Sequence, residues 1–176
     1  MDRFFCRLLL PLLLLLSATH VHAASSFVIS PSVGSASISN ISGYKSSTFL
    51  HLDGSFHPIP QLGVGVSLVG YPRFDSNGGG NNVSIKVTGY GAGVTGRWPV
   101  HPHVQPYVRV DYILWNAEVT GLGRTLAKDK GGSPGFAVGM QFPIRSIFGI
   151  KAEVSGYNNV SGAHIRQFSL GATFEF

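Results

Sequence analysis

A few side chains in this sequence are of the types that carry out acid–base chemistry. Asp111 and Glu153 are acidic residues within segments of alternating polarity, and two carboxylates held close together can act as general acid and general base. Such catalysis requires a cleft that admits a substrate. Nothing in the sequence places Asp111 and Glu153 at a cleft, so we expect a structural role for them.

Histidines offer a possible metal or catalytic site. His101 and His103 stand two residues apart in a short segment that contains prolines. As metal ligands they would need further ligands and supporting hydrogen bonds, and the neighbouring sequence supplies none. We therefore expect an exposed turn there and no metal site. His164 lies near the end of an alternating segment and is the candidate for a catalytic histidine.

The stretch GAGVTG, residues 91–96, matches the dinucleotide-binding pattern of glycines. That pattern binds a pyrophosphate only where a helix begins directly after it. Here Arg97, Trp98 and Pro99 follow, which indicates the end of a strand. We expect no nucleotide and no other cofactor.

Strands with two different faces must position these residues. In FGIKAEVSG, residues 148–156, apolar and polar or small side chains alternate, and successive side chains of a strand point to opposite faces. No amphipathic helical pattern of useful length follows the N-terminal region. The alternation predicts eight strands, at about 27–37, 48–57, 61–71, 83–98, 104–119, 133–142, 148–157 and 164–176.

The predicted connections are alternately short and long. The short ones contain proline, at 57–61, 98–104 and 142–148, whereas the long ones are rich in Gly, Ser and Asn, at 38–47, 71–82, 120–132 and 158–163. This order is typical of an eight-stranded antiparallel up-and-down transmembrane β-barrel in the bacterial outer membrane. The charged fraction of only 12% and the 23 glycines agree with this all-β fold class.

The N-terminus has the features of a secretory signal peptide. Arg3 and Arg7 precede or flank an apolar run that is too short to span a bilayer as a helix, and small residues follow it. We expect cleavage after about residue 23, with the barrel domain at 24–176. The single cysteine, Cys6, would leave with the peptide, so the mature chain would have no disulfide.

Several charged side chains fall on the inward phase of the predicted strands. In a narrow bore, isolated charges would be costly, so acids and bases should pair. We expect a structural ion-pair network, and a gated pore or proton path is the alternative. The seven residues of this predicted network are Asp53, Arg97, Arg109, Asp111, Lys151, Glu153 and Glu175.

Basic residues gather at the loop ends of the strands. A basic outer rim would attract the phosphates of lipopolysaccharide or sulfated host polymers, and no nucleic acid is implied. These residues are Lys45, Arg73, Lys86, Arg124, Lys128, Lys130 and Arg166.

Aromatic residues are expected to form two girdles at the membrane interfaces. The predicted girdle on the short-turn side consists of Phe56, Trp98, Phe142, Phe148 and Phe176, and that on the loop side of Tyr71, Tyr90, Tyr112 and Tyr157.

The sequence resembles the small OmpA-like and OmpX-like outer-membrane barrels. The resemblance is carried by GYGAGVTGRWPV, PYVRVDYILWNAEV and the final YNNVSGAHIRQFSLGATFEF. The ending with Phe174 and Phe176 is similar to the C-terminal signal that the outer-membrane assembly machinery reads. The family implies a transmembrane barrel with roles in envelope integrity, adhesion or host-factor binding, and no catalytic set. We expect the barrel to be a monomer.

Three alternatives stay open. Eight-stranded lipid A deacylases are similar in size, but their His-x-Ser pair is missing here, because Ile165 and Arg166 follow His164. The first alternative to a non-enzymatic barrel is thus not a deacylase of that type but another enzyme that modifies lipid A through rim residues such as His164. The second is a narrow ion-conducting porin, and the third is a soluble lipocalin-like carrier.

Overall fold

A computed structural model of the chain describes residues 25–41, 43–76, 83–122 and 124–176. The predicted signal peptide, residues 1–23, lies outside the described residues, as do residues 77–82 of the predicted loop at 71–82. No helix in the described part of the chain is long and apolar enough to cross a membrane.

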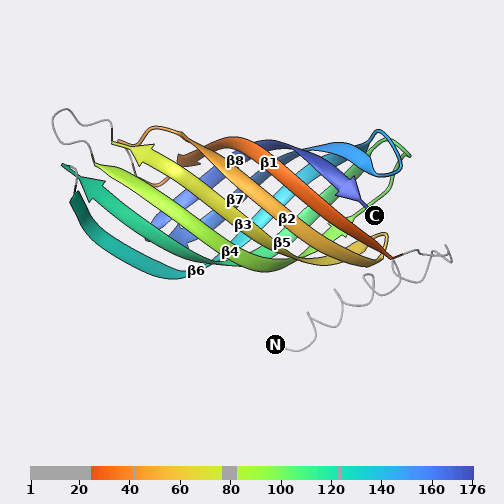
Figure 1. The fold of residues 1–176 in the computed structure, drawn as a ribbon, viewed down its shortest axis with the longest axis horizontal. Coiled ribbons are helices and arrows are strands. Elements are labelled where there is room, and N and C mark those ends of the chain that lie inside the picture. The colour runs from red at the N-terminus through yellow and green to blue at the C-terminus, as the bar shows by residue number, and fades with distance from the viewer. Residues whose placement is uncertain (1–24, 42, 77–82, 123) are drawn as a thin grey trace, which may run out of the picture.

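The described residues form a closed antiparallel barrel in which each strand pairs with its neighbours in sequence and β8 pairs with β1. The prediction of an eight-stranded up-and-down barrel is confirmed. Figure 1 shows the strands crossing the long axis obliquely, with the C-terminus and the start of β1 at the same end. The strands are β1 (Ser26–Ile38), β2 (Ser47–Ile59), β3 (Leu62–Asp75), β4 (Ser84–Arg97), β5 (Gln105–Gly121), β6 (Arg124–Pro143), β7 (Phe148–Val160) and β8 (Ala163–Glu175).

Alternation along the strands separates an apolar outer face from a mostly polar inner face. On β3, the outward Val66 is 66% exposed, whereas its neighbour Ser67 faces inward and is buried. Leu50 on β2 and Leu170 on β8 are also exposed. Exposing such a continuous apolar band to water would raise the free energy of the protein, whereas contact with the hydrocarbon of a bilayer would not.

The barrel closes through the first and last strands. Phe27 and Phe176 exchange two backbone hydrogen bonds of 2.9 Å each, between the N–H of one residue and the carbonyl oxygen of the other in both directions. Closure satisfies the backbone groups that an open edge would expose, which is the requirement for a sheet in lipid.

Two of the predicted long loops are wrong. Within 120–132, β5 continues to Gly121 and β6 already begins at Arg124, so only two residues separate the strands, and the described one, Leu122, lies in a turn. Leu122 has a φ of 52°, as such a tight turn requires. The segment 158–163 likewise contains the end of β7 and a turn at Ser161 and Gly162. Both segments are polar because strands outside the hydrocarbon need no apolar face.

The β5–β6 hairpin extends beyond the rest of the barrel wall. β6 pairs with β5 along almost its whole length, but its pairing with β7 starts only at Gly135 and Tyr157. Pro134 stands directly before that point, and proline has no N–H with which to continue a ladder. The β6 residues before Pro134 therefore form backbone ladder pairs with β5 alone, as the long teal end of β6 in Figure 1 illustrates.

Candidate functional site

The centre of the bore holds a network of ionic side chains around Arg109. Its guanidinium Nη1 lies 2.8 Å from Asp53 Oδ1 on β2, Nη2 lies 3.0 Å from Glu153 Oε1 on β7, and Nε lies 3.2 Å from Asp111 Oδ2. Lys151 Nζ lies 2.6 Å from Asp53 Oδ2. The structure thus brings together five of the seven residues of the predicted network, from three different strands.

Two tyrosines complete this network. It contains three carboxylates and only two cations, and hydroxyl donors add hydrogen bonds to two of the carboxylates, whereas the buried Asp111 Oδ1 accepts none within the described part of the chain. Tyr107 donates to Glu153 Oε2 at 2.8 Å, and Tyr157 donates to Asp111 Oδ2 at 3.2 Å. His51 Nε2 also lies 3.2 Å from Asp53 Oδ1. The sequence reasoning missed both phenols, although their positions on the inward phase of β5 and β7 could have indicated them.

The other two residues of the predicted network form a separate pair near the short-turn end. Arg97 on β4 contacts Glu175 on β8 through two hydrogen bonds, of 2.6 Å from Nη2 to Oε1 and 3.1 Å from Nη1 to Oε2. Ser26 on β1 donates to Glu175 Oε1 at 2.7 Å, and Arg97 Nε donates to the carbonyl oxygen of Pro60. Among the described residues, no ion pair joins this pair to the Arg109 network.

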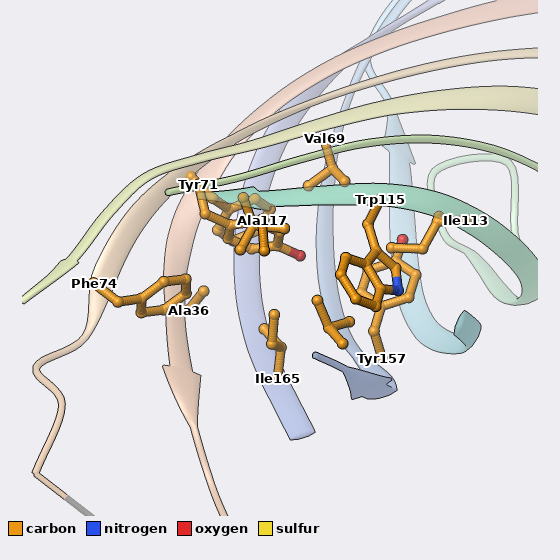
Figure 2. Close-up of a cluster of buried hydrophobic side chains, with 12 residues drawn as sticks. Ala36, Val69, Tyr71, Phe74, Ile113, Trp115, Ala117, Tyr157 and Ile165 are labelled. Carbon is orange, nitrogen blue, oxygen red and sulfur yellow. The ribbon is translucent and has the colours of Figure 1, made fainter. Parts of the chain in front are cut away.

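The loop-side half of the bore is filled by apolar side chains, which we call the plug. Figure 2 shows them converging from strands on opposite sides of the barrel. Tyr71 lies 5.7 Å from Phe49 and 5.6 Å from Phe74 between ring centroids, and Gln167 Nε2 donates to its hydroxyl at 2.5 Å. The plug consists of Ala36, Phe49, Val69, Tyr71, Phe74, Val87, Ile113, Trp115, Ala117, Tyr157, Val160 and Ile165.

This finding corrects the predicted loop-side girdle. Tyr71 and Tyr157 are only 0% and 2% exposed and face the bore, whereas Tyr90 and Tyr112 are each 54% exposed on the outer face. The alternation on β3 and β7 already puts Tyr71 and Tyr157 on the inward phase. A position near the end of a strand is shared by interfacial aromatics and by aromatics that face the bore, so it does not by itself indicate a girdle.

Little free space remains around the ionic network. Two cavities beside Asp53 and Arg109 measure about 30 and 40 Å³, and a cavity of about 10–15 Å³ already holds one water molecule. The carboxylates of Asp53, Asp111 and Glu153 all contact cations or phenols. The arrangement can stabilise charge, and the two cavities have room for a few water molecules.

The remaining candidates lie at the two ends of the barrel. The His101 and His103 rings are 5.6 Å apart in the short segment between β4 and β5. Among the described residues, no group of three or more His, Cys, Asp or Glu side chains could hold a metal ion. The His164 backbone N–H donates to Asn40 Oδ1 at 2.6 Å, but its imidazole has no hydrogen-bond partner within the described part of the chain.

The seven basic rim residues fall into distinct settings. Lys45 is exposed and its N–H donates to the carbonyl oxygen of Asp75. Arg73 pairs with the Asp75 carboxylate at 2.6 Å, and Arg124 is exposed where β6 begins. Arg166 points outward from β8. The other three, Lys86, Lys128 and Lys130, line one hollow of about 500 Å³ on the outer face of β4, β5 and β6.

The last residues of the chain lie at the short-turn end. The Phe174 ring lies 5.6 Å from that of Phe148 on β7, and the Phe176 side chain is 67% exposed. Phe176 is therefore placed where an interfacial aromatic would meet the membrane surface.

Comparison with known proteins assigns the barrel to a family. The model of the outer membrane protein beta-barrel domain matches residues 8–176. The chain belongs to this outer-membrane family. The protein is accordingly a transmembrane barrel of the bacterial outer membrane. No match is found among curated proteins.

Solved structures share the fold of this outer-membrane barrel at low sequence identity. Neisserial surface protein A is 17% identical with a TM-score of 0.67, covering 87% of this chain and 99% of that one. Ail of Yersinia pestis, in complex with the heparin analogue sucrose octasulfate, is 18% identical with a TM-score of 0.61, covering 89% and 100%. OprG of Pseudomonas aeruginosa is 14% identical with a TM-score of 0.59, covering 88% and 97%.

Proposed function

We propose that this barrel is a non-enzymatic protein that supports envelope integrity and presents its outer end for adhesion or ligand binding. The observation that carries the proposal is the combination of a filled bore with a projecting hairpin. The Arg109 network and the plug occupy the interior, whereas the β5–β6 hairpin extends past the β6–β7 ladder. A solid barrel is a rigid support on which exposed segments can carry function.

The charge of the outer end favours anionic ligands. Lys45, Arg73 and Arg124 are exposed there, and exposed positive charges attract polyanions over a distance of about 8 Å at physiological salt. Ail, which has the same fold, was solved with a heparin analogue. Sulfated polysaccharides are therefore the ligand class that we propose for the loops.

Binding of heparin to intact cells tests this proposal. A Gram-negative host producing the barrel should bind more fluorescent heparin than the same host without it, and chemically desulfated heparin should bind less. The loop variant, which combines Lys45→Gln, Arg73→Gln and Arg124→Gln, should lose most of the gain. The matched control combines Lys86→Gln, Lys128→Gln and Lys130→Gln and should retain it. Equal heparin binding with and without the barrel would refute the ligand-binding part of the proposal.

A further inference from the structure

We propose that the hollow on the outer face of β4, β5 and β6 binds the phosphate groups of a lipid headgroup in the outer leaflet. This inference rests on the proposed role in envelope integrity. It adds the place where the barrel would bind lipid, on the outer side of its wall. We call the hollow the rim site. Its cationic residues are Lys86, Lys128 and Lys130.

The rim site is a grid of side chains from three adjacent strands. One row places Lys86 opposite Glu118 and Glu118 opposite Lys128. The next row, nearer the membrane, places Thr88 opposite Asn116 and Asn116 opposite Lys130. Paired residues of neighbouring strands point to the same face. The side chains of the two rows therefore form one polar surface that points away from the bore. They supply six of the eight residues that line the hollow of about 500 Å³, and Ala117 and Asp129 supply the other two.

The depth of the rim site matches the boundary of the apolar band. Directly below the Asn116 row, Tyr90 lies opposite Leu114, and both are exposed outward. Two residues along a strand span about 7 Å, so the ammonium groups stand one step above the first apolar row. Aromatic residues such as Tyr90 mark the level of the lipid headgroups.

The ring of Tyr112 supports the placement of the rim site at the level of the lipid headgroups. A Cβ atom at Gly132 would lie 2.7 Å from Cζ of Tyr112, because the phenol ring lies against the glycine. Tyr112 can adopt this position only because residue 132 has no side chain. The phenol thereby lies along the lower edge of the rim site, between the apolar band and Lys130.

The two acidic residues of the rim site, Glu118 and Asp129, offset only part of its positive charge, because three lysines line the same hollow. Glu118 accepts a hydrogen bond of 2.7 Å from Thr125 Oγ1 and lies 3.9 Å from Lys128 Nζ. Asp129 accepts hydrogen bonds from Ser161 Oγ at 2.6 Å and from the backbone N–H of Lys130 at 2.8 Å. Both carboxylates are thus occupied by hydroxyl or backbone donors.

Two lysines are available to an anion. Within the described part of the chain, the ammonium groups of Lys86 and Lys130 make no ion pair. An ammonium group offers three donors on a flexible stem and binds phosphate as a point charge. Because the rim site faces the bilayer, the phosphate it can reach is that of a lipid, and a dissolved anion would have to displace lipid first.

Lipid retention by the purified barrel tests the rim site. The protein is placed in nanodiscs of phosphatidylcholine that contain either bisphosphorylated lipid A or the same lipid A after removal of both phosphates, and native mass spectrometry counts the lipid A molecules retained. We expect the wild type to retain the phosphorylated form about tenfold better. The rim variant, Lys86→Gln with Lys128→Gln and Lys130→Gln, should lose this preference.

Four controls show whether the preference depends on positive charge at the rim site. Replacing the same three lysines with arginine should preserve the preference, and so should the loop variant. Heat-modifiability on gels shows that each variant is folded. Glucosamine 1-phosphate at millimolar concentration should not displace the lipid.

The proposal is overturned if wild type does not distinguish the two lipids, or if the rim variant keeps the preference. It is also overturned if the loop variant loses as much, or if the soluble phosphate displaces lipid A. If the barrel does not bind heparin but still prefers phosphorylated lipid A, the proposed ligand-binding role is refuted and the proposed lipid site is not.

Discussion

The guanidinium of Arg109 lies 2.8 Å from the carboxylate of Asp53 and joins β5 to β2 across the bore. Its other nitrogens contact Asp111 and Glu153, so this one guanidinium forms ion pairs with three carboxylates. Burying charged groups costs desolvation free energy. The attraction between the paired charges offsets this cost only while every partner is present. The network therefore makes the fold sensitive to the loss of Arg109.

Replacement of Arg109 by methionine should destabilise the barrel by about 3–5 kcal/mol, the range for breaking a buried ion pair. The free energy of unfolding can be measured by urea titration in lipid vesicles, with tryptophan fluorescence as the signal. Arg73→Gln is the control, because the exposed Arg73–Asp75 pair should contribute at most about 1 kcal/mol. A double-mutant cycle with Asp53→Asn should give a coupling energy above about 1 kcal/mol. Additive effects would show that the contact is energetically unimportant.

The bore should not conduct ions. The plug and the Arg109 network close it at two successive levels, and the cavities beside the network are about 30 and 40 Å³. In planar bilayers the wild type should give no steady single-channel current. Phe49→Ala with Tyr71→Ala opens the upper level only, so that variant should also be silent. Reproducible wild-type channels would contradict this expectation and restore the porin hypothesis.

Lipid A should be chemically unchanged by the barrel. The His164 imidazole has no hydrogen-bond partner among the described residues, and a general base needs a second group that orients it. Mass spectrometry of lipid A should give the same profile from cells without the barrel, with the wild type and with His164→Ala. A mass shift that appears with the wild type and disappears with His164→Ala would establish the enzyme instead.

Gly135 should tolerate no side chain. A Cβ atom there would lie 2.6 Å from Cδ1 of Tyr157 and would also collide with the Asp111 carboxylate. Gly135→Ala should therefore disturb the Tyr157–Asp111 hydrogen bond and cost about 1–3 kcal/mol of unfolding free energy, as overpacking does. Gly70→Ala is the matched control, since a Cβ atom at Gly70 meets nothing within 4 Å. Equal urea midpoints for the two variants would contradict the expected crowding.

Alternation along the chain made most of the wall predictable from sequence. The residues that face hydrocarbon, such as Val66, must be apolar, and their neighbours, such as Ser67, need not be, so the period of two is visible. The hairpin at 120–132 was missed because this constraint ends where the strands leave the membrane. Lys128 and Lys130 on β6 therefore read as loop residues.

The contacts across the bore could not be derived in the same way. Which inward residues meet depends on the stagger between strands on opposite sides of the barrel, and the period of two fixes only the face. Arg97 consequently pairs with Glu175, apart from the Arg109 network. The apolar plug was hidden for a related reason, because alternation marks Tyr71 as inward but does not reveal that its inward neighbours on other strands are apolar too.

The Phe176 side chain should matter for assembly and not for stability. The two hydrogen bonds with Phe27 involve backbone atoms only, and the side chain is 67% exposed. Phe176→Ala should therefore refold from urea into vesicles with a free energy within about 0.5 kcal/mol of wild type, as is usual for exposed positions. In cells it should yield several-fold less heat-modifiable barrel, because we propose that the outer-membrane assembly machinery reads this terminal aromatic side chain. Phe168→Ala, another exposed outward position on β8, should not lower the yield of folded barrel in cells to the same extent. Equal losses in cells for both variants, or a large loss of stability with Phe176→Ala, would show that the terminal aromatic acts through packing alone.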